Sequence, residues 1–217
     1  MKPGDGIILF ATGVLFSQTV LDTLLDKKIK PAAIVLPVYP PAQMENLPGA
    51  KIEYKTDFDK FAGKALNLSI PVIYAPEKSQ HRLPGELSAI QADYILLACW
   101  PYLLSPEVTG LAGKAALNIH PSLLPRYRGA NPIAEQLAHK ESELGVSLHL
   151  LSDKYDQGDI LAQAKIRFPC GYPEKQKVEI KAAKVGTNLF IDAMKNYASS
   201  DWRPVKQPVA NPALRYR

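Results

Sequence analysis

Short apolar runs alternate with helical patterns through the first half of the chain. Residues 6–11 and 31–37 are apolar runs, and apolar residues at helical spacing lie between them up to about residue 28. A strand, a turn with glycine, a helix and a second strand make a βαβ unit. Continuously apolar strands indicate a parallel sheet covered on both faces. The same patterns predict a helix over residues 57–66 and strands over 71–75, 93–99 and 115–119, with a proline-rich loop over 39–49.

The pattern changes after residue 119. A short helix is predicted over residues 132–140, then two strands that pair in antiparallel fashion over 146–151 and 160–168, and a long helix over 174–197. The chain is therefore predicted to be α/β: one Rossmann-like domain with a mostly parallel sheet, helices on both faces and an antiparallel C-terminal part. We expect the domain to cover residues 1–200, with residues 201–217 as an irregular surface tail.

Composition narrows the class of protein only modestly. The 217 residues carry a formal charge of +5 without any block of five or six basic residues, so a solvated basic surface explains the charge as well as an anionic partner does. Two cysteines, Cys99 and Cys170, make no disulfide framework, which fits a reducing compartment. The N-terminal apolar run resembles a first strand more than a signal peptide, and no run approaches a membrane span. We therefore expect a cytoplasmic protein without a membrane partner.

Polar residues gather where the fifth predicted strand ends, which is where open α/β sheets bind ligands. Asn118 and His120 are two residues apart, so their side chains face the same side of the sheet. A second polar cluster, residues 153–159, lies between the two later strands and holds three aspartates and a glycine. An amide, an imidazole and a carboxylate together can polarise a carbonyl and move protons. A histidine in a core and aspartates in a turn are the equally simple structural interpretations.

Several other chemistries lack their sequence signals. No G-x-G-x-x-G fingerprint follows the first strand, so dinucleotide binding is not indicated. Ser122 lies beside His120, but no G-x-S-x-G elbow surrounds it, which disfavours a serine hydrolase. The histidines and cysteines lack the spacing of metal ligands, so we predict no metal site.

The stretch LNIHPSLLPRYRG at residues 117–129, followed by YDQGDI at 155–160, resembles the formyltransferases that use 10-formyltetrahydrofolate. That family includes methionyl-tRNA, phosphoribosylglycinamide and sugar N-formyltransferases. Its signature is an Asn-x-His pair, an SLLP loop and a later aspartate just before an x-Gly pair. The resemblance extends over nearly the whole chain and implies a Rossmann-like formyltransferase domain with Asn118, His120 and Asp156 as its catalytic residues.

The resemblance also implies roles for these residues. Asn118 and His120 would stabilise the oxyanion formed at the formyl carbon, and His120 would return a proton to N10 of the folate. Asp156 would orient His120 and favour its charged form. The residues that the resemblance assigns to binding of the co-substrate 10-formyltetrahydrofolate are Leu97, Tyr102, Leu103, Leu104, Ser122, Leu123, Leu124, Pro125, Tyr155 and Gly158. Cys99-Trp100-Pro101 departs from the glycine that the family usually carries there.

The acceptor amine is left open by the sequence. The glycine-rich phosphate loop of phosphoribosylglycinamide formyltransferases is replaced by Ala11-Thr12-Gly13-Val14-Leu15. The stretches RYRGANPI and YDQGDIL are more similar to methionyl-tRNA formyltransferases. Those enzymes have a second domain that binds the tRNA, and we do not expect such a domain in 217 residues. The length therefore does not support tRNA as the acceptor. A phosphorylated or nucleotide-linked amine, such as an amino sugar, is the further acceptor class, with Asn131 and Gln136 as candidate contacts. Two further functions also fit the resemblance: a formyltetrahydrofolate hydrolase and a non-catalytic folate-binding module.

Overall fold

The structure is a computed structural model that describes residues 6–37, 51–75, 77–168, 173–197, 199 and 202–208. The loop predicted over residues 39–49 and Cys170 lie outside these ranges, as does most of the predicted tail. The chain divides into two compact units, Met1–Leu117 and Asn118–Arg217. The division falls inside a strand, β5 (Ala112–His120), so this strand contributes to both units.

The first unit holds four parallel strands in the order β3-β2-β1-β4. Every residue of β1 and β2 is buried, as expected for strands that are covered on both faces. The register is in phase from strand to strand, with Leu9 of β1 opposite both Ile34 and Leu96. The strands are β1 (Ile7–Ala11), β2 (Ala33–Leu36), β3 (Val72–Tyr74) and β4 (Ala92–Ala98).

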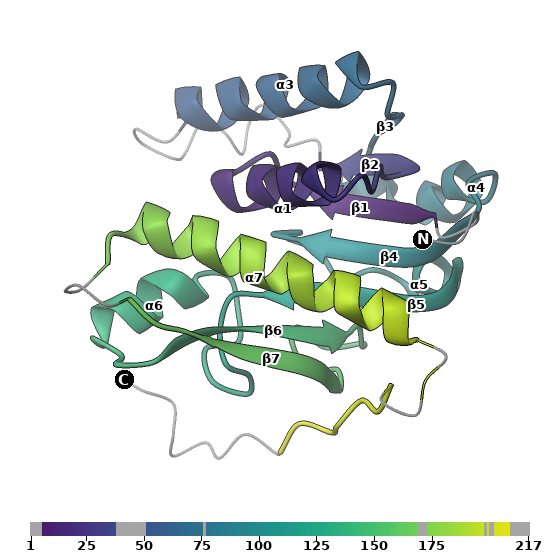
Figure 1. Cartoon of the computed structure of the whole chain (residues 1–217). Helices are drawn as coiled ribbons and strands as arrows, with labels where there is room; N and C mark the ends of the chain where they lie inside the picture. The colour runs from purple at the N-terminus through teal and green to yellow at the C-terminus, as the bar shows by residue number, and fades with distance from the viewer. Residues whose placement is uncertain are drawn as a thin grey trace. The chain divides into compact units, whose positions relative to one another are not determined.

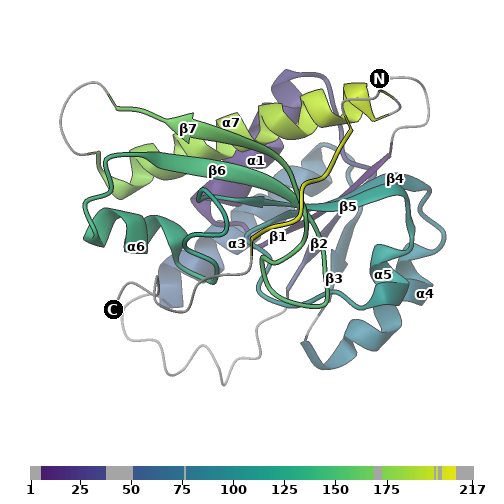
Figure 2. The same ribbon diagram turned by 90° about the horizontal axis from the view of Figure 1, so that it is seen from below.

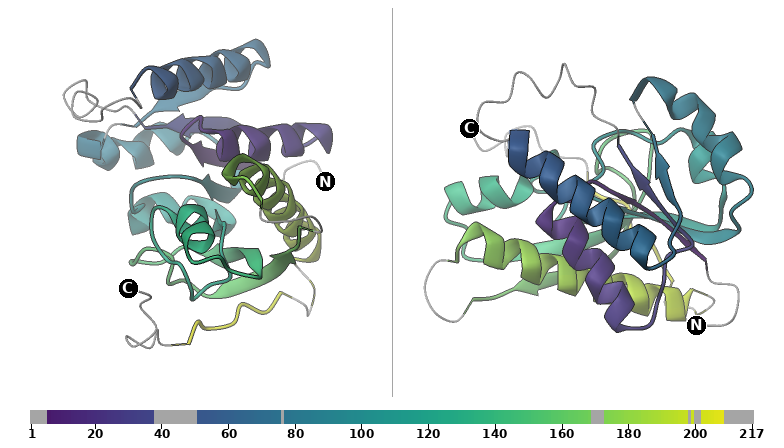
Figure 3. Two further views of the ribbon diagram at one scale, coloured as in Figure 1. Left: turned by 90° about the vertical axis from the view of Figure 1, so that its left-hand side faces the viewer. Right: turned by 90° about the horizontal axis from the view of Figure 1, so that it is seen from above.

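Two long helices of this unit, α1 (Leu15–Asp26) and α3 (Lys51–Asn67), lie side by side (Figure 3). An ion pair between Asp22 and Lys64 joins them. The apolar face of α1 buries Phe16, Val20, Leu21 and Leu24. These helices confirm the predicted crossovers, although α3 begins six residues earlier than the sequence pattern indicates.

Three short helical segments of the first unit were not predicted. They are the 3-10 segment η1 (Glu77–Arg82) and the helices α4 (Leu83–Leu87) and α5 (Pro106–Thr109). Each spans at most six residues, so none is long enough to show a helical period. Pro84 and Pro106 sit in the first turn of α4 and α5, where proline is tolerated because its missing N–H has no partner inside the helix.

The second unit is built on the antiparallel pair β6 (Leu144–Leu150) and β7 (Ile160–Ile166). The helix α7 (Lys175–Asn196) packs along both strands, and the shorter α6 (Pro132–Ala138) packs against α7 (Figure 1, Figure 2). The predicted antiparallel pair is therefore confirmed. The strand order over the chain is β3-β2-β1-β4-β5-β6-β7, one mostly parallel seven-stranded sheet of the Rossmann-like α/β class with an antiparallel edge.

Residues 202–208, which we name the C-terminal strap, form part of this unit. Val205 and Ile160 exchange two backbone hydrogen bonds of 2.8 Å, so the strap pairs in antiparallel fashion with the start of β7. The sequence predicted irregular surface chain here. The physical reason for the difference is that the edge of β7 still offers unpaired N–H and C=O groups, which a short extended segment satisfies.

Gly186 allows the close approach of α7 to the sheet. A Cβ at this position would lie 2.3 Å from Cγ2 of Ile119 and 2.9 Å from Cγ2 of Val146. Both neighbours are buried side chains, at 1% and 0% exposure, so neither has room to withdraw. The absence of a side chain is therefore what fixes the distance between this helix and the strands beneath it.

We predict that Gly186→Ala destabilises the protein by about 1–3 kcal/mol, the usual range for overpacking a core. Gly63→Ala in α3 is the matched control, because no atom lies within 4 Å of a Cβ there. That control should be neutral or stabilising by roughly 0.5–1 kcal/mol, since alanine is the better helix former. The free energy of unfolding from urea titration measures both, and equal effects of the two substitutions would contradict the packing argument.

Candidate active site

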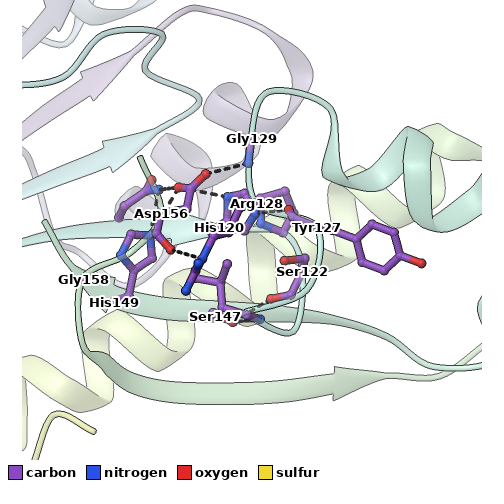
Figure 4. A network of polar contacts seen from close by, with 12 residues as sticks. His120, Ser122, Tyr127, Arg128, Gly129, Ser147, His149, Asp156 and Gly158 are labelled. Atoms are coloured by element: carbon purple, nitrogen blue, oxygen red, sulfur yellow. Dashed lines mark hydrogen bonds and ion pairs between the residues drawn. The ribbon is translucent and has the colours of Figure 1, made fainter. Parts of the chain in front are cut away.

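The candidate active site lies wholly in the second unit and joins β5, β6 and two loops. We name them the β5 loop (residues 121–131) and the β6–β7 loop (residues 151–159). Asn118 and His120 alternate at the end of β5 and face the same side, as predicted. The β6–β7 loop brings Asp156 against His120 (Figure 4). Asp156 also accepts a hydrogen bond from Asn118, so the three predicted catalytic residues meet.

His149, at the end of β6, is a further member that the sequence did not single out. Its side chain is 1% exposed and its Nε2 lies 3.1 Å from Nδ2 of Asn118. Nδ1 of the same ring lies 2.8 Å from the carbonyl oxygen of Leu150, which can only accept, so Nδ1 carries the proton. In the neutral ring Nε2 therefore accepts a hydrogen bond from the amide of Asn118. The second hydrogen of that amide is donated to Oδ1 of Asp156 at 3.2 Å.

His120 is held from both ring nitrogens. Nε2 donates to the carbonyl oxygen of Tyr127 at 2.7 Å, and Nδ1 lies 3.3 Å from Oδ1 of Asp156. Burial lowers the pKa of His120 below its usual value, because the desolvated imidazolium is more strongly disfavoured than the Asp156 charge and the Tyr127 carbonyl favour it. Asp156 thus favours the charged form of His120, in the expected direction, but burial outweighs this effect. With Nε2–H bonded to Tyr127, the neutral ring presents the lone pair of Nδ1 toward Asp156.

Asp156 is the hub of the site. Its Oδ2 accepts a hydrogen bond from the backbone N–H of Gly129 at 2.9 Å, and its Oδ1 faces Asn118, His120 and His149. Burial alone would raise the pKa of this carboxyl, but the neighbouring imidazoles of His149 and His120 and the N–H of Gly129 together lower it below its usual value. Asp156 is therefore the ionised member of the site at neutral pH. Its Oδ2 contacts the β5 loop, and its Oδ1 contacts the ends of β5 and β6.

The β5 loop is fastened to β6 by Ser147. The hydroxyl of Ser147 donates to the carbonyl oxygen of Ser122 at 2.6 Å and accepts from the backbone N–H of Leu124 at 3.0 Å. The amide of Gln163 donates to both the Ser147 hydroxyl and the Leu124 carbonyl oxygen. These side-chain bonds anchor the start of the β5 loop to β6 and β7, and the same loop carries Tyr127 and Gly129 to the site.

Tyr127 is itself anchored at its other end. Its hydroxyl donates to Glu141, which also pairs with Arg126. Burial and the bond to Glu141 raise the pKa of Tyr127 to about 12, so the phenol stays a neutral donor. The backbone of Tyr127 has a positive φ of 57°, which turns the chain so that its carbonyl oxygen meets His120.

The predicted folate contacts fall in different environments. Ser122 is fully buried, with its hydroxyl bonded to the carbonyl oxygen of Arg126. Gly158 is also buried, and a Cβ there would lie 1.8 Å from the carbonyl oxygen of Leu150. The more accessible members of the second unit are Leu123, Pro125 and Tyr155, while Leu124 is buried. Their roles in binding stay predictions.

The remaining predicted contacts belong to the first unit. Leu97 and Leu104 are buried, Tyr102 is half-buried, and Leu103 is 39% exposed. Trp100, the middle residue of the Cys99-Trp100-Pro101 stretch, is buried in edge-to-face contact with Phe10 and Tyr102. Trp100 is therefore a core residue of the first unit. Gln136, a candidate acceptor contact, is 2% exposed and donates to the carbonyl oxygens of Pro121 and Pro132, so it supports the β5 loop.

Within the part of the chain that the structure describes, no group of three or more His, Cys, Asp or Glu side chains is arranged to hold a metal ion. The described helices also include none that is both long enough and apolar enough to cross a membrane.

The fold and the site together define a Rossmann-like α/β enzyme domain with an amide, two imidazoles and a buried carboxylate at the carboxyl end of a central strand. The profile of the formyl transferase family matches residues 6–194, and the chain belongs to this family. The match covers most of the chain, so it includes every residue of the site.

Individual relatives agree with this assignment. The chain is 29% identical over 200 residues to a methionyl-tRNA formyltransferase of Helicobacter pylori, a match that covers 91% of this chain and 62% of that protein. The chain thus spans about three-fifths of the length of that relative. Two solved structures share the fold: a phosphoribosylglycinamide formyltransferase from Bacillus halodurans (TM-score 0.66, 20% identity, 90% of this chain and 96% of that one) and a formyltetrahydrofolate deformylase from Pseudomonas syringae pv. tomato (TM-score 0.67, 15% identity, 95% and 67%).

The site makes a prediction about titration. The imidazole of His120 should titrate at lower pH in the folded protein than a histidine of the urea-unfolded chain, because burial disfavours its charge. Asp156→Asn should move the midpoint lower still, since it removes the carboxylate that favours the imidazolium. Nitrogen-15 NMR of the histidine rings measures both midpoints. A midpoint of His120 above that of the unfolded chain would contradict the dominance of burial.

Proposed function

We propose that this protein transfers the formyl group of 10-formyltetrahydrofolate to an amine acceptor. The observation that carries the proposal is the meeting of Asn118, His120 and Asp156 in one hydrogen-bonded site, in a chain that belongs to the formyl transferase family. Folate is the implied co-substrate, and no metal takes part in the proposed reaction. We also propose a cytoplasmic location, because the two cysteines give no disulfide framework.

In the proposed reaction the acceptor nitrogen attacks the formyl carbon, and the formyl oxygen becomes an oxyanion. Asn118 is the donor to this oxygen. Both hydrogens of its amide point to acceptors, Nε2 of His149 and Oδ1 of Asp156, so the oxygen competes with one of them. A developing oxyanion is a stronger acceptor than a neutral imidazole nitrogen, so Asn118 binds the transition state better than the uncharged carbonyl. That difference is what lowers the barrier.

Proton transfer completes the reaction. The acceptor nitrogen loses one proton when the new C–N bond forms, and N10 of tetrahydrofolate gains one when the old C–N bond breaks. His120 and Asp156 are the groups that carry this proton, because Nδ1 and Oδ1 lie 3.3 Å apart and share a single position for it. The lowered pKa of His120 leaves the ring neutral and able to accept a proton at neutral pH.

Among acceptors, the methionyl-tRNA type and the sugar-nucleotide type fit best. Support for the first is the similarity to the Helicobacter pylori protein over most of this chain. Glycinamide ribonucleotide is disfavoured because the turn after β1 lacks a glycine-rich phosphate loop, and the backbone N–H of Thr12 in this turn is directed at the Ser17 hydroxyl, 3.4 Å away. We assign residues 1–200 to the catalytic domain, and the C-terminal strap pairs with the start of its strand β7.

A panel assay tests the proposal directly. The protein is incubated with 10-formyltetrahydrofolate and, separately, methionyl-tRNA, glycinamide ribonucleotide and a nucleotide-linked amino sugar. Formylated product from one of these, with tetrahydrofolate released in equal amount, is the expected result. Formate released at full rate without any amine would indicate the hydrolase instead. Folate binding without turnover would indicate a binding module.

Asn118→Ala should lower kcat by about 10²–10³-fold, as removal of one oxyanion donor does in other acyl-transfer enzymes. KM for the folate should change little, because the interaction is made mainly in the transition state. Asn67→Ala is the matched control, since Asn67 is exposed at the end of α3. An Asn118→Ala enzyme with near-normal kcat would remove Asn118 from the proposed mechanism.

A further inference from the structure

The C-terminal strap places one amide against the backbone of the β6–β7 loop. Val205 pairs with Ile160 in antiparallel register, so two residues farther along the strap Gln207 stands opposite Gly158. Gln207 is half-buried there and reaches the two residues that frame the catalytic turn, Asp156 and Gly158. The strap is therefore in direct contact with the loop that supplies the carboxylate of the site.

All the hydrogen-bonding capacity of the Gln207 side chain is used. Its Nε2 donates to the carbonyl oxygens of Asp156 at 2.9 Å and Gly158 at 2.7 Å. Its Oε1 accepts from Nε of Arg128 at 3.1 Å and from Nη2 at 2.5 Å. Two donors and two acceptor positions are what a primary amide has, so a carboxylate, which only accepts, could not make this set of bonds.

Arg128 contacts both Gln207 and the backbone of Asp156. Its Nε also donates to the carbonyl oxygen of Asp156 at 3.1 Å, and it lies in the β5 loop between Tyr127, which holds His120, and Gly129, which holds the Asp156 carboxylate. Gln207 thus ties together, through one side chain, the two loops that meet on Asp156.

The hydrogen bonds of Gln207 and Arg128 stabilise an unusual backbone conformation of Asp156. Asp156 has a positive φ of 54°, a region that aspartate adopts more readily than most residues but that is still strained. Such a conformation persists when surrounding contacts determine it. The Asp156 carbonyl oxygen, which fixes the orientation of the peptide after the carboxylate-bearing residue, accepts from both Gln207 and Arg128.

We propose that Gln207 is a positioning residue for catalysis: through the backbone of Asp156 and Gly158 it holds the Asp156 carboxylate in register with Asn118 and His120. Its action on turnover rests on the proposed function, whereas its action on the carboxylate does not. The strap then belongs to the active site, although it is distant from it in the sequence. The conformation of the β6–β7 loop depends on the hydrogen bonds of Gln207.

Gln207→Met is the primary test, because it keeps the volume and neutrality of the side chain and removes all of its hydrogen bonds. We expect kcat for formyl transfer to fall roughly 10- to 100-fold, the effect of a small displacement of a catalytic group, with little change in the KM for folate. Carbon-13 NMR of the Asp156 carboxyl should show its pKa rise from its lowered value toward that of a free aspartate, because Asn118, His120, His149 and Gly129 no longer hold it. The acid limb of the rate profile should move to higher pH with it.

Val205→Pro is an independent variant, since it removes the N–H that the strap donates to Ile160 and leaves the side-chain amide of Gln207 intact. It should change kcat and the Asp156 titration in the same direction. Gln91→Met is the matched control, at an exposed glutamine of the first unit, and should leave both unchanged. Thermal unfolding confirms that each variant is folded at the assay temperature.

The outcomes separate the two proposals. Lower thermal stability with an unchanged Asp156 titration and unchanged kcat would mean that Gln207 is merely structural, and the inference would be overturned. Where the unsubstituted protein formylates no acceptor, the proposed function fails, and the carboxyl titration alone decides the role of Gln207. A rise in that pKa in both strap variants then still supports positioning, and its absence refutes it.

Discussion

The contacts of the buried Asp156 carboxylate are the interaction on which the candidate site of the second unit depends. One oxygen accepts from the amide of Asn118 and the other from the backbone of Gly129, while the two histidines approach the first oxygen from β5 and β6. An ionised group taken out of water is costly unless its oxygens are hydrogen-bonded, so this carboxylate requires every one of these partners to be in place. The strand ends and the two loops are therefore mutually dependent.

The same burial explains why His120 and Asp156 differ in charge state. Desolvation disfavours charge on both His120 and Asp156, but only Asp156 has enough donors to overcome it. The result is an ionised acid beside a neutral imidazole, and this pair can take up one proton between Oδ1 and Nδ1 and release it again. Asn118 has no charge to gain or lose, so its amide can serve the formyl oxygen at any pH at which the fold is intact.

Much of the fold was accessible from the sequence, because continuously apolar runs such as residues 6–11 have few competing conformations besides a buried parallel strand. The three catalytic candidates were accessible because the motif around residues 117–129 is specific. His149 was missed because a histidine among apolar neighbours on a strand is indistinguishable from a core residue until its ring partners are known. The net charge state of His120 could not be predicted, because the sequence shows the opposite charge nearby but not the degree of desolvation.

The strap was the least accessible feature, and the reason is general. Its prolines and polar residues predict irregular chain. The strap is indeed irregular apart from the one bridge at which Val205 pairs with Ile160 of β7. Pairing of Val205 with Ile160 fixes the register, and register alone places an amide opposite Gly158. Gly158 in turn has no room for a side chain, because the carbonyl oxygen of Leu150 occupies the place of a Cβ. The backbone N–H of Leu150 donates a hydrogen bond to the carbonyl oxygen of Asp159. The β6–β7 loop is thus closed at its base by the hydrogen bond between Leu150 and Asp159 and held at its turn by the strap, so the position of the Asp156 carboxylate depends on the edge of the sheet as well as on the loop.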